Sequence, residues 1–226
     1  MARHQKKNHA TRCLMPLMLC SILLSCGDTD KSVASYGTRA ARVISSTPIP
    51  KLESPQVATL LINSVVIIGD SLTVGTELYG TTLTQSLYDA EITNVSVLAE
   101  NGRTTSEGID ELERLLLTDG VVVLALGTND VASGTPDVFG KLIDRAVAAV
   151  PESVDIYWLN LYTDYWVSDD AYNAVIAQKA DVHSNLVVMD FETFASPNWL
   201  EEDGVHLTPD GYISRTAFIL SELGLN

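Results

Sequence analysis

Basic residues and cysteines are both scarce in this chain. Lysine and arginine number 14 against 29 aspartates and glutamates, which leaves a formal net charge of −15. Nucleic acid is therefore an unfavourable partner, because a phosphate backbone is bound by clustered Lys and Arg side chains. Disorder over the whole length is also excluded, since hydrophobic residues make up 46% of the sequence and charged residues only 19%. The 226 residues suffice for one domain with additional segments.

The N-terminal segment differs in charge from the rest of the sequence. Four cations lie within the first twelve residues, and no acidic residue precedes Asp28. Residues 13–24 form an apolar run that is too short to span a hydrocarbon core of ~30 Å and has the length of a secretory signal. Residues 1–25 are therefore expected to be an export signal.

The end of this run, Leu23-Leu24-Ser25-Cys26, resembles the bacterial lipobox. In lipoproteins of that kind the signal is removed before the cysteine, whose amine and thiol are then acylated. The resemblance implies an exported protein that is anchored by lipid on Cys26 to the extracytoplasmic side of a bacterial membrane. The alternatives are a short membrane anchor and an ordinary secretory signal in which Cys26 is incidental.

The cysteine count limits the chemistry of the mature chain. Of the three cysteines, Cys13 and Cys20 would leave with the signal and Cys26 would carry lipid. No thiol and no disulfide would remain, so cysteine-based catalysis is excluded and core packing alone would stabilise the fold. The sequence also has no cluster of histidines and cysteines at metal-ligand spacing, and no metal or other cofactor is expected.

The remaining sequence divides into a tether and one domain. Residues 26–58 are rich in Ser, Thr, Ala and Pro and are expected to be a flexible, lipid-anchored tether. Short apolar runs predict strands at 65–68, 95–99, 121–126, 156–161 and 186–189. Apolar periodicity predicts helices at 109–116, 135–150 and 172–180, and another from residue 208. This alternation predicts an α/β domain over 59–226, with helices on both faces of a five-stranded parallel sheet.

Polar residues follow these strands where parallel sheets place their sites, at the carboxyl ends. Ser71 follows the first strand and opens a helix, Gly102 follows the second strand and Asn129 the third, and Asp203 and His206 precede the last helix. A serine becomes a nucleophile when a base takes its proton, and that base needs an orienting carboxylate. Ser71, His206 and Asp203 are therefore candidate catalytic residues. The backbone N–H groups of Ser71 and Gly102 and the amide of Asn129 are candidate oxyanion donors.

These segments resemble the SGNH, or GDSL, hydrolase family. The family's four blocks are matched in order and spacing by Gly69-Asp70-Ser71-Leu72, Gly102, Gly127-Thr128-Asn129-Asp130 and Asp203-Gly204-Val205-His206. The resemblance covers residues 62–223. It implies a three-layer, flavodoxin-like fold, Ser71 as nucleophile with Asp203 and His206 as its triad partners, and an oxyanion hole of Ser71, Gly102 and Asn129.

Some of these roles have alternatives in the sequence. Gly102 and Asn129 also suit turns, and Glu201 or Glu202 could replace Asp203 beside the histidine. The spacing of three residues between Asp203 and the histidine favours Asp203, because one loop then presents both side chains.

The C-terminal stretch PNWLEEDGVHLTPDGY and the pair Gly102-Arg103 look like the extracellular SGNH domains of peptidoglycan O-acetyltransferases. Those domains transfer acetyl groups to muramic acid residues and are normally joined to a membrane acyltransferase module. After residue 26 the sequence has no apolar run long enough to span a bilayer. Transfer would therefore need a membrane acyl-donor protein, or another donor, as a partner, whereas ester hydrolysis would not.

Four residues are candidates for binding an acyl-ester or carbohydrate substrate: Arg103, Tyr162, Tyr165 and Trp166. The three aromatic residues follow the fourth predicted strand and could stack on a sugar ring. Trp199 could also stack on a sugar ring, although packing in the core or in a lid without sugar contact is favoured for it. The sequence thus favours a serine esterase or O-acyltransferase that acts through an acyl-serine on cell-envelope carbohydrate. The alternative is a non-catalytic, lipid-anchored carbohydrate-binding module on the same fold.

Overall fold

The computed structural model describes residues 62–164 and 169–225. The expected signal, Cys26 and the tether lie outside the described residues, as do Tyr165 and Trp166. Within the described ranges, no helix combines the length and the apolar character needed to cross a membrane.

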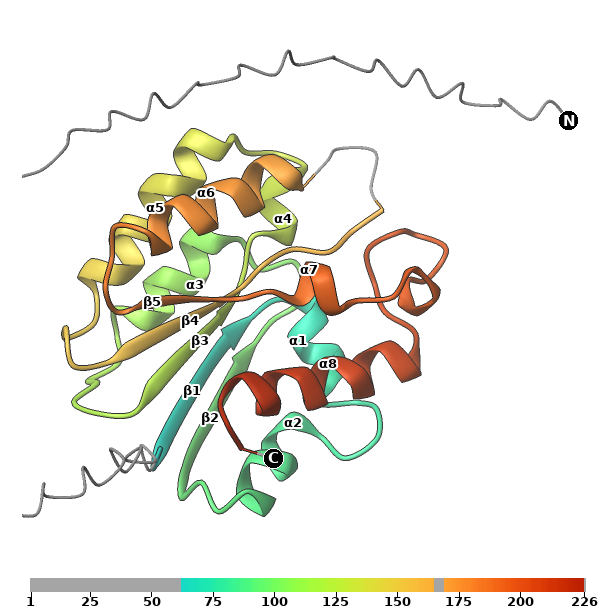
Figure 1. The fold of residues 1–226 in the computed structure, drawn as a ribbon, viewed down its shortest axis with the longest axis horizontal. Coiled ribbons are helices and arrows are strands. Elements are labelled where there is room, and N and C mark those ends of the chain that lie inside the picture. The colour runs from blue at the N-terminus through green and yellow to red at the C-terminus, as the bar shows by residue number, and fades with distance from the viewer. Residues whose placement is uncertain (1–61, 165–168, 226) are drawn as a thin grey trace, which may run out of the picture. The chain divides into compact units, whose positions relative to one another are not determined.

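Five parallel strands form one sheet (Figure 1). Its order is β2-β1-β3-β4-β5, with the bounds β1 (Ser64–Gly69), β2 (Asn94–Ala99), β3 (Val121–Ala125), β4 (Asp155–Leu159) and β5 (Leu186–Met189). The chain passes from β1 to β2 on one side and then returns to β3 on the other. The carboxyl ends of β1 and β3 therefore flank the point at which a sheet of this type places its ligands.

The sheet agrees with the strands predicted from the sequence. β3 and β4 end earlier than their apolar runs, because Leu126 and Leu161 have left the ladder while remaining 0% and 4% exposed. Side chains of β1 alternate between two cores, with Val65 and Ile67 in one and Val66 and Ile68 in the other. A strand buried on both faces explains why the run is continuously apolar.

Helices cover both faces of the sheet, so the domain has three layers (Figure 1). One face carries α3 (Thr105–Leu112), α4 (Thr128–Val131), α5 (Pro136–Ala148) and α6 (Asp170–Ala180). The other carries α1 (Ser71–Thr76), α2 (Leu83–Asp89), α7 (Phe191–Phe194) and α8 (Pro209–Glu222), with the short 3-10 helix η1 (Pro197–Trp199) before α8.

The helix starts follow local sequence signals. The Thr-Pro-Asp sequences before α5 and α8 both form caps, in which Thr135 Oγ1 accepts from the backbone N–H of Val138 and Thr208 Oγ1 accepts from that of Gly211. The predicted extension of α3 to Leu116 is wrong. The helix ends at Leu112, Leu116 is 98% exposed, and Leu115 and Leu117 contact the core instead.

Candidate active site

The turn after β1 places Ser71 at the start of α1. Gly69 ends the strand, and a Cβ there would lie 2.0 Å from Thr73 Oγ1, so only glycine allows the turn to pack this closely. The side chain of Asp70 caps the helix, because its Oδ1 accepts from the backbone N–H of Leu72 at 3.0 Å. Ser71 is therefore the first residue of the helix and lies at the carboxyl edge of the sheet.

The structure brings Ser71, His206 and Asp203 together. Nε2 of His206 lies 3.1 Å from Ser71 Oγ, and Nδ1 of the same ring lies 2.7 Å from Asp203 Oδ2. The other oxygen of Asp203 accepts the backbone N–H groups of Val205 and His206 at 2.9 Å each. Glu201 and Glu202, which compete for the carboxylate position in the sequence, instead line a neighbouring groove.

The triad loop, residues 200–208, is closed by backbone contacts between its two ends. Leu200 and Leu207 form an antiparallel bridge, and the N–H of Thr208 donates to the carbonyl oxygen of Trp199 at 2.7 Å. The side chains at its tip are half exposed, with relative exposures of 44% for His206 and 53% for Asp203. The ring is therefore fixed by hydrogen bonds and remains accessible from solvent.

Hydrogen bonds hold Asp203 in its ionised form. Partial burial alone would raise the pKa of this carboxyl, but the His206 ring and the two backbone N–H groups outweigh burial and lower the pKa to about 2. A carboxylate facing Nδ1 keeps the imidazole proton on that nitrogen and turns Nε2 toward the serine.

Two backbone N–H groups near Ser71 lack acceptors in the described part of the chain. They belong to Ser71 itself and to Gly102, which follows β2 with a φ of +76°. Glycine is favoured at such a φ, and no atom lies within 4 Å of the position of a Cβ at Gly102. Both N–H groups are available to a negatively charged oxygen.

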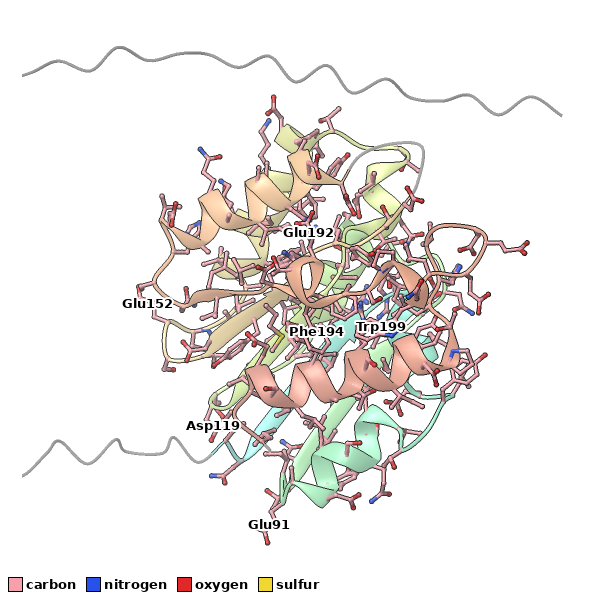
Figure 2. All side chains as sticks on the ribbon, turned by 45° about the vertical axis from the view of Figure 1, so that its right-hand side comes forward. Glu91, Asp119, Glu152, Glu192, Phe194 and Trp199 are labelled. Atoms are coloured by element: carbon pink, nitrogen blue, oxygen red, sulfur yellow. The ribbon has the colours of Figure 1, made fainter. Side chains whose placement is uncertain are left out.

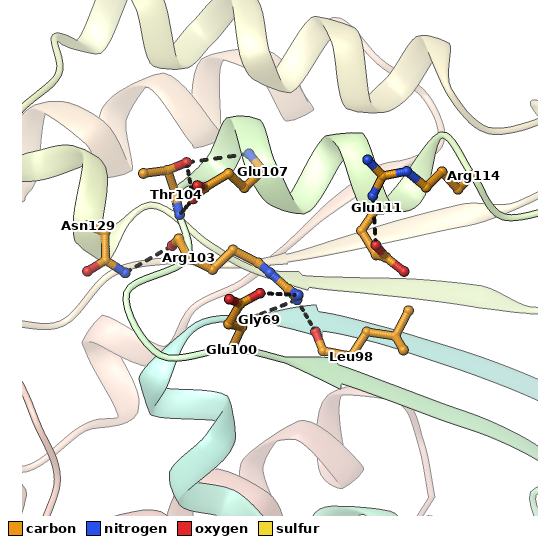
Figure 3. Close-up of polar contacts among 9 residues, drawn as sticks. All are labelled: Gly69, Leu98, Glu100, Arg103, Thr104, Glu107, Glu111, Arg114 and Asn129. Atoms are coloured by element: carbon orange, nitrogen blue, oxygen red, sulfur yellow. Dashed lines mark hydrogen bonds and ion pairs between the residues drawn. The ribbon is translucent and has the colours of Figure 1, made fainter.

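Asn129 lies on α4, and its amide nitrogen is held between two loops. It donates to the carbonyl oxygen of Arg103 at 3.0 Å (Figure 3) and lies 3.4 Å from Asp70 Oδ2. The second of these hydrogen bonds is long. The segments containing Asp70, Gly102 and Asn129 are thus joined side by side at the carboxyl edge of the sheet.

Arg103 is turned toward the backbone of the sheet. Its guanidinium binds the carbonyl oxygens of Leu98 and Gly69 and pairs with Glu100 (Figure 3). The Arg103 side chain is only 11% exposed. The guanidinium is thus occupied by backbone carbonyl oxygens of β1 and β2 and by Glu100, and a contact between Arg103 and substrate stays a prediction.

A small pocket opens beside His206. It has a volume of about 260 Å³ and is lined by Thr128, Asn129, Val131, Ala132, Thr163, Asp203, Val205 and His206. Three of these residues are apolar. This hollow is called the Val131 pocket below.

A larger groove of about 640 Å³ adjoins the same loop. It is lined by Tyr162, Thr163, Asp164, Pro197, Leu200, Glu201, Glu202, Asp203 and Gly204, and is called the Tyr162 groove below. Asp164, Glu201 and Glu202 form no ion pair within the described residues, so the groove is strongly acidic. Of the three aromatic candidates, Tyr162 lies in this groove, and the other two are not described.

Trp199 packs against neighbouring rings, as expected. Its ring centroid lies 5.6 Å from that of Phe194, and Figure 2 shows the two side chains next to α8. The Cβ of Trp199 also lies against Gly211 of α8. Packing of the α7–η1 segment on α8 accounts for this tryptophan.

Three carboxylates come close enough to hold a metal ion. Oxygens of Asp169, Asp170 and Glu192 lie within 4.8 Å of one another. The protein already uses two of them as acceptors, because Asp169 binds Thr163 and Glu192 binds Asn173. Burial raises the pKa of both Asp169 and Glu192, which makes the pair less suited to a cation.

Several residues of the site were not predicted from the sequence. Val131, Ala132 and Val205 line the Val131 pocket, and Thr163 lines both hollows. Val131 and Ala132 directly follow the Gly127–Asp130 block, and this position in the sequence could have identified them as pocket residues. In addition, Asp130 accepts hydrogen bonds from the backbone N–H and the hydroxyl of Thr105, and these bonds join α4 to α3.

Comparisons with known proteins identify a family and a shared fold. The model of a family described as "GDSL-like Lipase/Acylhydrolase family" matches residues 67–212. An arylesterase from Vibrio mimicus is 26% identical over 179 residues, which cover 70% of this chain and 87% of that protein.

Solved structures share the fold at lower identity. The lipase/acylhydrolase from Enterococcus faecalis has a TM-score of 0.59 at 20% identity, over 72% of this chain and 95% of the other. The C-terminal catalytic domain of peptidoglycan O-acetyltransferase A from Streptococcus pneumoniae has a TM-score of 0.55 at 16% identity, over 72% of this chain and 93% of that domain.

Proposed function

The chain belongs to the GDSL-like lipase/acylhydrolase family and is a serine esterase of the SGNH type; on this premise we propose that Ser71 is its nucleophile, His206 the general base and Asp203 the carboxylate that orients the histidine. The observation that carries this assignment is the 3.1 Å hydrogen bond between Ser71 Oγ and His206 Nε2. Since Asp203 holds the proton on Nδ1, Nε2 is the nitrogen that can accept the serine proton.

In the first half-reaction Ser71 Oγ attacks the ester carbonyl carbon while His206 Nε2 takes the hydroxyl proton. The N–H groups of Ser71 and Gly102 stabilise the negative charge that develops on the carbonyl oxygen. As the ester C–O bond breaks, His206 gives the proton to the departing alcohol oxygen and leaves an acyl group on Ser71. Water or an acceptor hydroxyl then attacks this acyl group, His206 takes and returns the proton, and the product is an acid or a new ester.

Asn129 is the third proposed oxyanion donor. The Arg103 carbonyl oxygen holds one side of its amide at 3.0 Å, whereas the contact with Asp70 is 3.4 Å. The longer contact is the one that an oxyanion replaces, while Arg103 keeps the amide in position.

Acetyl esters are the proposed substrates. The Val131 pocket has a volume of about 260 Å³, which is below the ~300–1,000 Å³ of pockets that enclose drug-sized ligands. Val131, Ala132 and Val205 give it an apolar wall beside His206. A pocket of this size suits a short acyl chain, and longer chains would extend into solvent.

The alcohol part of the ester is proposed to be a cell-envelope carbohydrate that binds in the Tyr162 groove. This groove shares Asp203 and Thr163 with the Val131 pocket, and the Tyr162 ring offers a face for a sugar. The proposed export signal and lipid anchor on Cys26 are consistent with an envelope substrate. Hydrolysis and transfer use the same acyl-Ser71, and transfer would add a membrane acyl-donor protein as partner.

Turnover of p-nitrophenyl acetate tests the proposal. Ser71→Ala and His206→Ala are each expected to reduce kcat by at least about 10³-fold, because members of a triad act as a unit. Ser86→Ala on α2 is the matched control and should retain activity. Mass spectrometry of the protein after incubation with acetyl donors, with and without a glycan acceptor, should locate an acetyl group on Ser71. Unchanged rates in either triad variant would refute the assignment.

A non-catalytic carbohydrate-binding module is the alternative function. It predicts glycan binding that survives Ser71→Ala, together with no ester turnover by the unaltered protein. The continuous hydrogen bonds from Asp203 through His206 to Ser71 favour the enzyme, because a binding module has no use for an activated hydroxyl.

A further inference from the structure

Helix α4 carries Asn129 but has little structure of its own to fix that side chain. It comprises only Thr128–Val131, a single turn, and its N-cap is Gly127, which has no side chain to cap the helix. A single helical turn is unstable unless tertiary contacts hold it. The position of the Asn129 amide therefore depends on contacts between α4 and its neighbours.

Asp130, the residue after Asn129, makes such contacts in two directions. Its Oδ2 accepts the backbone N–H of Thr105 on α3 at 2.9 Å and the hydroxyl of the same residue at 2.7 Å. Its backbone carbonyl oxygen accepts the hydroxyl of Tyr172 on α6 at 3.0 Å. Thr105 is 0% exposed and Tyr172 is 3% exposed, so both partners are packed in place. Asp130 thus fixes α4 between two longer helices.

The residue that the Asp130 carboxylate holds lies close in sequence to Gly102. Thr105 is the first residue of α3, and between it and Gly102 the carbonyl oxygen of Arg103 accepts from the Asn129 amide at 3.0 Å (Figure 3). Gly102 itself is exposed, and no atom lies within 4 Å of the position of a Cβ there. Its N–H is therefore placed by the contacts that hold the segment after it, and two neighbouring residues of α4 make those contacts.

We propose that Asp130 is a positioning residue for the oxyanion hole, whose carboxylate clamps α4 to the start of α3 so that the Asn129 amide and the Gly102 N–H face the same oxygen. The inference rests on the esterase function proposed above. Oxyanion donors act only when they lie ~2.7–3.1 Å from the place where the negative charge develops. A displacement of ~1 Å can lower the rate ~100-fold, so a residue that fixes the spacing of two donors affects catalysis without touching the substrate.

Steady-state kinetics with p-nitrophenyl acetate test the inference. Asp130→Ala is expected to lower kcat by about 10–100-fold and to leave KM nearly unchanged, because oxyanion donors act on the transition state rather than on the bound ester. Asp130→Asn keeps an oxygen that can accept from Thr105 and should recover most of kcat. Asp144→Ala is the matched control, since the Asp144 carboxylate joins α5 to Lys179 of α6 away from the site. It should lower the melting temperature without changing kcat.

The double variant Asn129→Ala/Asp130→Ala separates positioning from a general loss of structure. Once the amide is absent, Asp130 has no side chain to position, so the second substitution should lower kcat by less than about threefold relative to Asn129→Ala alone. Losses that multiply to the product of the two single effects overturn the inference, because they would show that Asp130 acts independently of Asn129.

The partner residue provides a second route if Asp130→Ala does not fold. Thr105→Val keeps the shape of the side chain and removes its hydroxyl donor. A fall in kcat of about threefold or more at unchanged KM supports the inference, and an unchanged kcat overturns it. Turnover that survives Ser71→Ala would refute the esterase assignment and this inference together, whereas a folded Asp130→Ala variant with the kcat of the unaltered protein refutes the inference alone.

Discussion

Asp164 and Gly204 are joined by a backbone hydrogen bond of 2.7 Å, in which the N–H of Asp164 donates to the carbonyl oxygen of Gly204. This bond ties the loop after β4 to the triad loop. The neighbouring residue Thr163 lines both the Val131 pocket and the Tyr162 groove. The acyl and alcohol parts of an ester would thus be held against one wall that is fixed to the catalytic loop.

Asn129→Ala is expected to lower kcat by about 10²–10³-fold, as observed for the loss of other oxyanion donors. The side chain lies on the short helix α4 at the carboxyl edge of the sheet and is only partly buried, so the melting temperature should change little. Steady-state kinetics with p-nitrophenyl acetate and a thermal melt check both points, with the exposed Asn94→Ala as control. A large rise in KM with kcat intact would contradict the role, because it would indicate ground-state binding.

The size of the Val131 pocket should set the acyl-chain preference. Val205→Ala enlarges the pocket and is expected to raise kcat/KM for the hexanoate ester relative to the acetate ester by about tenfold. Ala132→Leu fills the same space and should act in the opposite direction. The ratio is measured with p-nitrophenyl esters of increasing length. Equal ratios in both variants would show that the acyl chain binds elsewhere.

Asp203 should make the stability of the fold depend on acid pH. Its pKa is lowered from 3.8 to about 2 in the folded protein, so the ionised carboxylate stabilises the fold above about pH 4. This stabilisation is lost as the pH falls through that window. The difference in free energy of unfolding between the unaltered protein and Asp203→Asn, measured with urea, should be constant above about pH 5 and decline below pH 4. A difference that persists to pH 2 is the contrary result.

Much of the fold, and the contact between Asp203 and His206, followed from local sequence signals, whereas the partners of Arg103 did not. The runs at 65–68 and 121–126 predicted strands, since strands buried on both faces need apolar residues throughout. Arg103 is a predicted substrate contact, and the pair Gly102-Arg103 is notable only for its likeness to the O-acetyltransferase domains. In the fold the Arg103 guanidinium binds backbone carbonyl oxygens of β1 and β2, and no residue pattern marks which carbonyl groups a side chain from the next loop will reach.

The acidic Tyr162 groove should discriminate by the charge of the alcohol. An ester with an anionic alcohol part is expected to have a KM about fivefold higher than a neutral ester of similar size, the factor for ~1 kcal/mol of repulsion near water. Glu201→Gln/Glu202→Gln should reduce this factor, and so should added salt. Glu111→Gln on α3 is the control. Equal KM values for both esters at low salt would place the alcohol outside the groove.

Cys26→Ser tests the proposed anchor. A lipidated protein should appear in the membrane fraction and move to the soluble extracytoplasmic fraction when the acylated cysteine is removed. Cys20→Ser, within the proposed signal, is the matched control and should remain membrane-bound. Mass spectrometry of the mature N-terminus identifies the lipid, and an unmodified Cys26 in the membrane-bound protein would contradict the proposal.

Because the strands of the sheet are parallel, all their carboxyl ends lie at one edge of the sheet and all their amino ends lie at the opposite edge. The described chain enters β1 at Ser64 and reaches the reactive serine only after the strand has crossed the sheet, a rise of about 20 Å over its six residues. The described chain therefore begins at the end of the sheet opposite the one that carries Ser71 and its partners.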